Sequence, residues 1–149
     1  MNEDKTEVVS VEYIETYKNM VKYLKVLYQD VQVLHHNIKG VAFFSNHEQL
    51  AEMYEDVGKI TDNLIELGMT IGILEPSIEE SLAFKQSIEV RFYDYKECFA
   101  IVRDEFARAI ALMELAKVNV PADIKNKIEE HEHNLRVWGL YKSQMVLED

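Results

Sequence analysis

The sequence has few residues that interrupt a helix. Two prolines and five glycines occur among 149 residues, so long stretches contain no helix breaker. A single cysteine excludes a disulfide framework and a zinc site built from several thiolates. No apolar run reaches the length of about 20 residues that spans a bilayer, and the N-terminus lacks the charged and apolar pattern of a signal peptide. We therefore expect a cytoplasmic protein that does not enter a membrane.

Basic residues are also scarce. Lysine and arginine total 16 against 27 acidic residues, which gives a net charge of −11. Binding to the DNA backbone depends on clustered positive side chains that release counterions, and neither end of the chain carries a basic arm. We therefore do not expect direct DNA binding. An acidic surface suits the attraction of cations, although acidity is also a common means of staying soluble, and the second explanation is favoured.

Apolar residues are abundant and follow a helical pattern. They make up 48% of a chain without internal repeats, which is enough for the core of one domain. They recur every three or four positions and hardly anywhere alternate as in a strand. The sequence therefore predicts an all-α domain over residues 11–149, preceded by a flexible acidic tail over residues 1–10.

The first half of the chain predicts two long helices. One spans about residues 11–38, and the second spans about residues 46–67. Ser45 or Asn46 can cap the second helix, and Gly68 is typical of a helix end.

The second half predicts one short and two long helices. Ser77 and Glu80, directly after Pro76, have the spacing of a capping box, so a short helix is expected there. A third long helix spans about residues 85–118, and a fourth begins at Pro121. The expected apolar face of the fourth helix comprises Ile124, Ile128, Leu135, Trp138 and Tyr141.

The link between the second and third helices is informative because of its length. Antiparallel neighbours need only a few connecting residues, whereas residues 68–84 can cross the bundle and begin the next helix at the same end. The prediction is a ferritin-like four-helix bundle with a short extra helix in the crossover between helices 2 and 3.

Four side chains have suitable chemistry for binding a metal: His35, His47, Asp62 and Glu66. The two histidines flank Gly40, so they can meet only if two helices join at a sharp corner. Asp62 and Glu66 share one face of the second helix with His47, but a rise of roughly 22 Å separates His47 from Asp62. One chain cannot bring all four side chains to one ion.

A second copy of the chain can complete the site. If the second helices of two chains pack antiparallel about a twofold axis near residues 54–57, the histidine of one comes opposite the two carboxylates of the other. The small residues Ala51 and Gly58 lie on that face and let two backbones approach. The spacing therefore predicts two shared metal sites per dimer.

The ligand series resembles that of the Dps (starvation-induced DNA-protection) miniferritins. Their H-W-N-x-x-G, F, H and D-x-x-x-E series is matched by His35 to Gly40, Phe43, His47, Asp62 and Glu66. The short segment after Pro76 and the late Trp138 extend the resemblance over nearly the whole chain.

The resemblance implies a function as well as a fold. It implies Fe(II) bound by two histidines of one subunit and by Asp62 and Glu66 of its twofold neighbour, and oxidation of that iron by peroxide inside a hollow dodecamer. Zinc or manganese would suit the same ligands.

Two residues depart from the family pattern. Ala51 stands where the family usually has an aspartate, and His36 stands where it usually has a tryptophan. Glu48 and Glu55 lie about one turn from Ala51 and are candidates to compensate. Three functions thus remain open: a ferroxidase, a Dps-like shell or dimer with a degenerate site and a structural or metal-scavenging role, and a helical adaptor without metal.

Two other features have simpler explanations. Cys98 lies among aromatic residues, which favours a core or interface thiol over a ligand. Glu130 and His133 have the spacing of a di-iron pair, but no second pair accompanies them. We interpret residues 129–133 as a solvated charged stretch.

Overall fold

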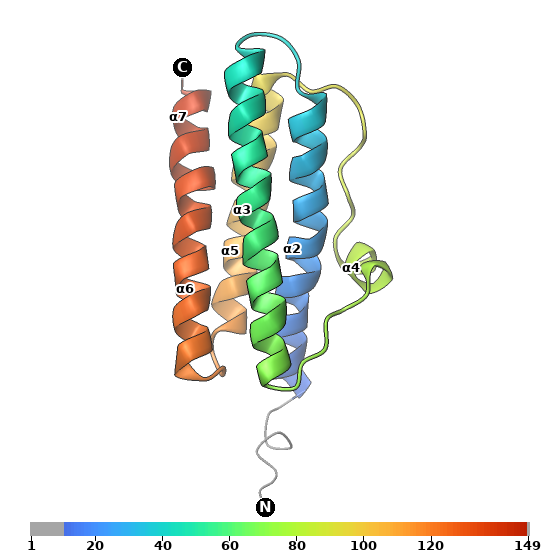
Figure 1. Cartoon of the computed structure of the whole chain (residues 1–149), viewed down its shortest axis with the longest axis vertical. Coiled ribbons are helices and arrows are strands. Elements are labelled where there is room, and N and C mark those ends of the chain that lie inside the picture. Colours follow the sequence, from blue (N-terminus) through green and yellow to red (C-terminus); the bar gives the residue numbers. More distant parts are fainter. Residues whose placement is uncertain (1–10, 149) are drawn as a thin grey trace, which may run out of the picture.

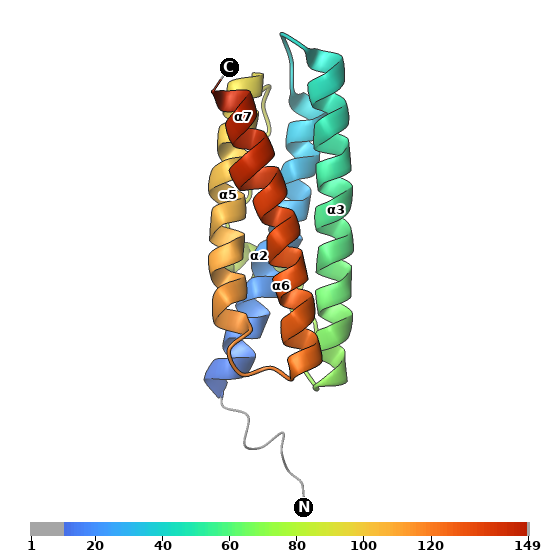
Figure 2. The same ribbon diagram turned by 90° about the vertical axis from the view of Figure 1, so that its left-hand side faces the viewer.

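The computed structural model describes residues 11–148, and the expected tail over residues 1–10 lies outside this part. Four long helical rods stand side by side (Figure 1; Figure 2 gives the view turned by 90°). No strand occurs within residues 11–148, so the all-α class is confirmed. The elements are α2 (Val11–Asn37), α3 (Phe43–Thr70), α4 (Ile78–Phe84), α5 (Tyr95–Ala116), α6 (Ala122–Arg136), the π-helical η1 (Val137–Lys142) and α7 (Ser143–Leu147).

The connection between α3 and α5 crosses the length of the bundle. It contains α4 and carries the chain back to the end where α3 began, so α3 and α5 run parallel (Figure 1). The predicted capping box of α4 is present, because the Ser77 hydroxyl accepts from the Glu80 amide and the Glu80 carboxylate accepts from the Ser77 amide. The ferritin-like bundle with a short helix in its crossover is therefore confirmed.

The core is formed by apolar side chains from all four rods. None of the helices within residues 11–148 is long and apolar enough to cross a membrane. Cys98 is fully buried in this core, in agreement with the expected core thiol. The largest fully buried side chains include Tyr17, Leu24, Leu27, Leu34, Leu50, Met53, Leu64, Phe106, Met113, Ile124 and Ile128.

Helix α3 differs from its prediction at both ends. Its N-cap is Ala42, in the left-handed conformation at φ 57°, so neither Ser45 nor Asn46 caps the helix. Gly68 lies inside the helix and not at its end. A Cβ atom at Gly68 would lie 2.8 Å from Cε1 of Tyr17, so this glycine serves tertiary packing.

The third long helix begins ten residues later than expected, at Tyr95 instead of Lys85. Residues 85–94 run in extended form beside α2 (Figure 1). Asp94 caps α5, since its side chain accepts from the Glu97 amide and the Glu97 carboxylate accepts from the Asp94 amide. The helix starts where this capping box lies, and the preceding segment is held by other contacts.

A buried ion pair holds that extended segment. The Lys85 ammonium lies 2.8 Å from Oδ2 of Asp30 and 3.2 Å from Oε1 of Glu105. The Ile88 amide donates to the other Asp30 oxygen at 3.1 Å, and the Tyr23 hydroxyl donates to Glu105. The crossover is thus attached to both α2 and α5 through polar groups that are largely shielded from water.

The last rod contains the other departures from prediction. Tyr141 is 60% exposed, so it does not belong to the apolar face on which Trp138 and the other expected residues are buried. Glu132 is also buried, and its Oε1 lies 3.0 Å from the ammonium of Lys117, the residue that directly follows α5. The stretch over residues 129–133 is therefore not solvated throughout, because one of its carboxylates joins α6 to α5.

Candidate metal site

The corner between α2 and α3 brings the two predicted histidines together. The connection turns at Gly40, which has a φ of 99°, a conformation that favours glycine. The rings of His35 and His47 stack, with centroids 4.1 Å apart and an interplanar angle of 17°. Both side chains are partly buried at this end of the bundle.

Reciprocal hydrogen bonds orient both rings. Nδ1 of His35 donates to the carbonyl oxygen of His47 at 2.9 Å, and Nδ1 of His47 donates to the carbonyl oxygen of His35 at 2.7 Å. Since a carbonyl oxygen can only accept, each Nδ1 carries the hydrogen, and a neutral ring then keeps its lone pair on Nε2. Burial lowers the pKa of His35, which favours that neutral form. Two imidazole nitrogens are therefore available as ligands.

Further aromatic rings pack against this pair. Phe43 stacks on His47 with centroids 5.1 Å apart, and Tyr54 stacks on His35 at 5.8 Å. The ring of Tyr28 lies 5.1 Å from that of Tyr54 and is tilted by 33° against it. Tyr54 was not predicted to lie at this corner, although its position two helical turns after His47 places it on a neighbouring part of the helix surface. The rings restrict the orientation of both imidazoles.

His36 and Ala51, the two departures from the family pattern, also lie at this corner. The ring of His36 is exposed and 4.9 Å from that of His35. Ala51 lines an open pocket together with His35 and His47, and Glu48 is another of its lining residues. The pocket is therefore lined by both histidines, by Glu48 and by the methyl group of Ala51.

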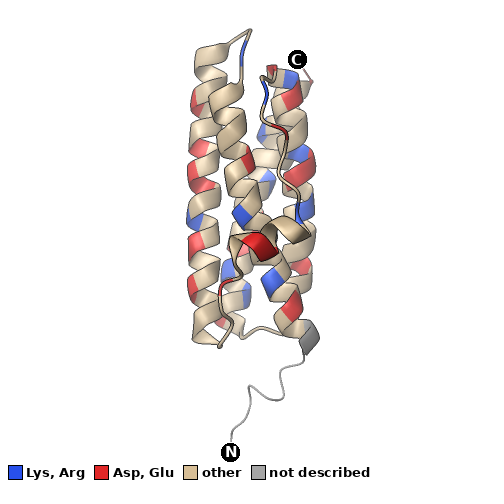
Figure 3. Ribbon diagram, turned by 90° about the vertical axis from the view of Figure 1, so that its right-hand side faces the viewer, with Lys and Arg blue, Asp and Glu red and all other residues tan. Residues whose placement is uncertain are grey.

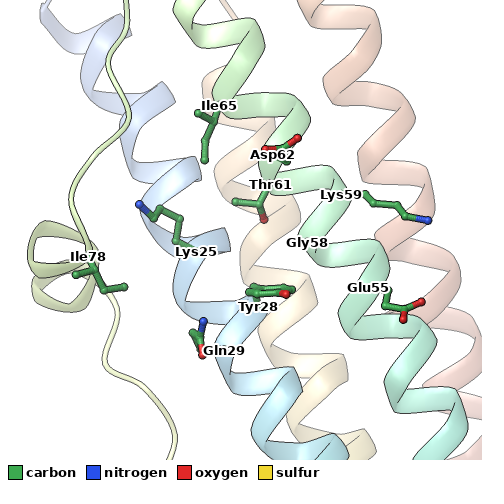
Figure 4. A pocket seen from close by; sticks show the side chains of 10 residues that line it. All are labelled: Lys25, Tyr28, Gln29, Glu55, Gly58, Lys59, Thr61, Asp62, Ile65 and Ile78. Carbon is green, nitrogen blue, oxygen red and sulfur yellow. The ribbon is translucent and has the colours of Figure 1, made fainter.

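Asp62 and Glu66 lie further along α3, with exposed side chains. Asp62 lines a separate pocket between α2, α3 and α4, which neither His35 nor His47 reaches (Figure 4). Within residues 11–148 of one chain, no three His, Cys, Asp or Glu side chains are grouped to hold a metal ion. The single chain thus joins the two histidines and leaves both carboxylates apart, and a site shared by two chains stays a prediction.

Gly58 was expected to let the helix of a second chain approach α3, but the structure gives it a different role. A Cβ atom there would lie 2.6 Å from Cε1 of Tyr28, so the glycine makes room for a ring of its own chain. Its small size is therefore no evidence that a second helix approaches α3.

Comparison with known proteins rests on solved structures, since no family model and no curated protein sequence matches the chain. Antigen TpF1 from Treponema pallidum is 20% identical with a TM-score of 0.86, over 100% of this chain and 97% of that one. A Dps protein from Bacillus brevis is 21% identical with a TM-score of 0.76, over 99% and 97% of the two chains. Dps from Microbacterium arborescens, solved in a high iron form, is 17% identical with a TM-score of 0.80, over 94% and 97%.

These similarities cover the whole bundle, including the crossover and its short helix. At such low identities they establish the fold and leave the chemistry to be argued from the residues. The chain has the fold of the Dps miniferritins.

Proposed function

We propose that this protein binds and stores iron, and that it oxidises Fe(II) with hydrogen peroxide at sites shared by two copies of the chain. The function would limit oxidative damage by removing both reactants. We place it in the cytoplasm and expect no direct DNA binding.

The observation that carries the proposal is the orientation of the two imidazoles. Both rings donate through Nδ1 to main-chain carbonyls, which is the arrangement by which proteins usually orient histidines that bind a metal through the other nitrogen. Asp62 and Glu66 would complete the ligand set from the neighbouring chain, and hard carboxylate oxygens favour the ferric product.

One further feature supports association of chains. Large apolar side chains are exposed along the crossover and α4, which is typical of a surface that another subunit covers. They are Leu74, Ile78, Leu82 and Phe84, which are 41–69% exposed. Twofold dimers would then build a homo-oligomer, for which the resemblance to Dps implies twelve subunits.

The charge of α3 fits a cationic substrate. Its acidic positions follow one side of the molecule (Figure 3), and they outnumber the single basic residue Lys59 on this helix. A field of one sign raises the local concentration of Fe²⁺. The acidic residues of α3 are Glu48, Glu52, Glu55, Asp56, Asp62 and Glu66.

The reaction balances as a two-electron reduction of peroxide. Two Fe(II) ions each give one electron, and one hydrogen peroxide molecule takes both with two protons to form two molecules of water. His35 and His47 would hold the iron, and the acidic surface would receive the Fe(III) product. Zinc or manganese could occupy the same ligands, so the test must use iron.

The test is Fe(II) oxidation by peroxide, followed in the near ultraviolet after anaerobic loading. His47→Ala should abolish the fast phase of wild-type protein, whereas His133→Ala, which removes an exposed histidine of α6, should leave it unchanged. Equal slow rates in the wild type and His47→Ala would refute the proposal.

Ala51 favours a second candidate function, a Dps-like shell or dimer that retains metal but oxidises it poorly. In that case Ala51→Asp should greatly accelerate oxidation. If the chain is instead a helical adaptor with no metal role, replacement of both His35 and His47 by alanine would leave iron binding unchanged.

A further inference from the structure

A second pocket lies between α3 and the last rod, and it shares no lining residue with the pocket beside the two histidines. Its walls come from α3 and from α6 and η1 of the last rod, which stands beside α3 (Figure 1). Convergent polar groups in a concave surface are typical of a ligand site. The lining residues with charged, amide or imidazole groups are Asp56, Lys59, Asn63, His131, Asn134 and Lys142.

The charges of this pocket are positive in balance. Lys59 and Lys142 contribute two ammonium groups, and within residues 11–148 neither takes part in a hydrogen bond or an ion pair. Figure 4 shows the Lys59 side chain directed away from α2. Asp56 contributes the single carboxylate, and one of its oxygens accepts from the Trp138 indole at 2.8 Å. On a chain of net charge −11, a pocket with two unpaired cations and one anion favours an anionic ligand.

The backbone of the last rod changes its winding at this pocket. η1 is π-helical over Val137–Lys142, and this rare conformation is frequent at functional sites. The Lys142 ammonium lies over the Trp138 ring, 4.3 Å from its centroid. The Ser143 hydroxyl donates to the Trp138 carbonyl at 2.7 Å and supports this turn. Since Trp138 and Lys142 both line the pocket, their contact holds the ammonium at its wall.

His131 adds a hydrogen-bond acceptor that has no donor. Its Nε2 donates to the amide oxygen of Asn63 at 2.7 Å, so the hydrogen of a neutral ring lies on Nε2 and the lone pair on Nδ1. Burial lowers the pKa of His131, which favours this neutral form. Nδ1 is buried and has no hydrogen-bond partner within residues 11–148, although buried polar atoms are nearly always paired. Because His131 lines the pocket, a ligand with a hydroxyl group can supply the missing donor.

We infer that this pocket binds a small oxyanion that keeps a hydroxyl group, of which hydrogen phosphate is the simplest. Lys59 and Lys142 hold its negative charge through charged hydrogen bonds, and Nδ1 of His131 accepts from its hydroxyl. The inference goes beyond the proposed function, because the pocket includes none of the proposed iron ligands.

Isothermal titration calorimetry of the full chain, freed of metal by a chelator, tests this inference at neutral pH. Inorganic phosphate should bind saturably, with one site per chain. Sulfate carries no proton at this pH and should bind at least about tenfold more weakly, since it leaves the acceptor of His131 unpaired. Because the protein is free of metal, a failure of the proposed iron chemistry does not affect the result.

Single substitutions locate the binding. Lys59→Gln and Lys142→Gln should each weaken phosphate binding about tenfold or more, because each removes a charged donor. Lys125→Gln is the matched control, since it removes the same charge from an exposed position of α6 outside the pocket and should leave binding unchanged. His131→Phe removes the acceptor and should abolish the preference for phosphate over sulfate. Circular dichroism of each variant checks that the fold is retained.

Three outcomes would overturn the inference. The first is the absence of saturable phosphate binding at millimolar concentrations. The second is equal binding of phosphate and sulfate by the wild type, which would exclude recognition of the hydroxyl group. The third is an equal effect of Lys142→Gln and Lys125→Gln, which would show that net charge alone attracts the anion.

Discussion

Replacement of Lys85 by methionine should destabilise the fold strongly. The side chains of Lys85 and Asp30 are only 6% and 2% exposed, and that of Glu105 is 13% exposed. Methionine fills a similar volume but leaves the buried Asp30 carboxylate without its cation, whereas Glu105 keeps the Arg108 guanidinium 3.7 Å away. Removal of one partner from a buried ion pair costs about 3–5 kcal/mol, so we expect a loss of this size in the free energy of unfolding.

Urea denaturation followed by circular dichroism, at one fixed protein concentration, measures this loss. Lys96→Met removes an exposed lysine of α5 and should change stability by less than about 0.5 kcal/mol. Asp30→Asn added to Lys85→Met should recover part of the loss, since one stranded charge disappears. A Lys85→Met protein within about 1 kcal/mol of the wild type would refute the reasoning.

Three further predictions concern other parts of the bundle. Gly58→Ala should lower stability by about 1–3 kcal/mol because the added Cβ displaces the Tyr28 ring; a rise in the urea midpoint, as helix propensity alone predicts, would contradict this. Burial lowers the pKa of His35, so this side chain binds a proton more readily in the unfolded chain than in the folded one. The contribution of His35 to the free energy of unfolding is therefore fully present above the unfolded pKa of about 6.5 and is lost as the pH falls below it. A pH series of urea curves in which His35→Ala shows the same slope as the wild type below this pH would exclude the effect. Trp138→Phe should cost about 1–2 kcal/mol through the unpaired Asp56 carboxylate, and an unchanged urea midpoint would show that this bond adds nothing.

The sequence predicted the bundle because the patterns that indicate its helices lie within short stretches of the chain. Apolar spacing identified every long helix, and the pair Ser77 and Glu80 marked the short one. Lys85 was misassigned because a lysine looks like a solvated helix position until its two carboxylate partners, distant in sequence, are known. Gly68 was misassigned for a similar reason, since the ring that requires its missing side chain comes from another helix.

For the candidate site, too, only the features that depend on residues close together in the sequence could be predicted. Gly40 between two histidines indicated a corner, and the structure has one with the rings in contact. The hydrogen bonds that leave Nε2 free depend on main-chain atoms from both helices, for which no residue pattern exists. The position of Asp62 and Glu66 relative to another chain depends on association, which spacing can suggest but a single chain does not contain.

The main-chain acceptors of the two imidazoles have a consequence for the order of events. Because carbonyl groups and aromatic neighbours hold both rings, the corner is complete before any ion arrives, and binding requires little rearrangement within the chain. Folding of this corner then does not require metal binding, in contrast to small domains that unfold when their metal is removed. If the proposed function holds, a newly made chain would be competent to capture iron as soon as it has folded and found its partner.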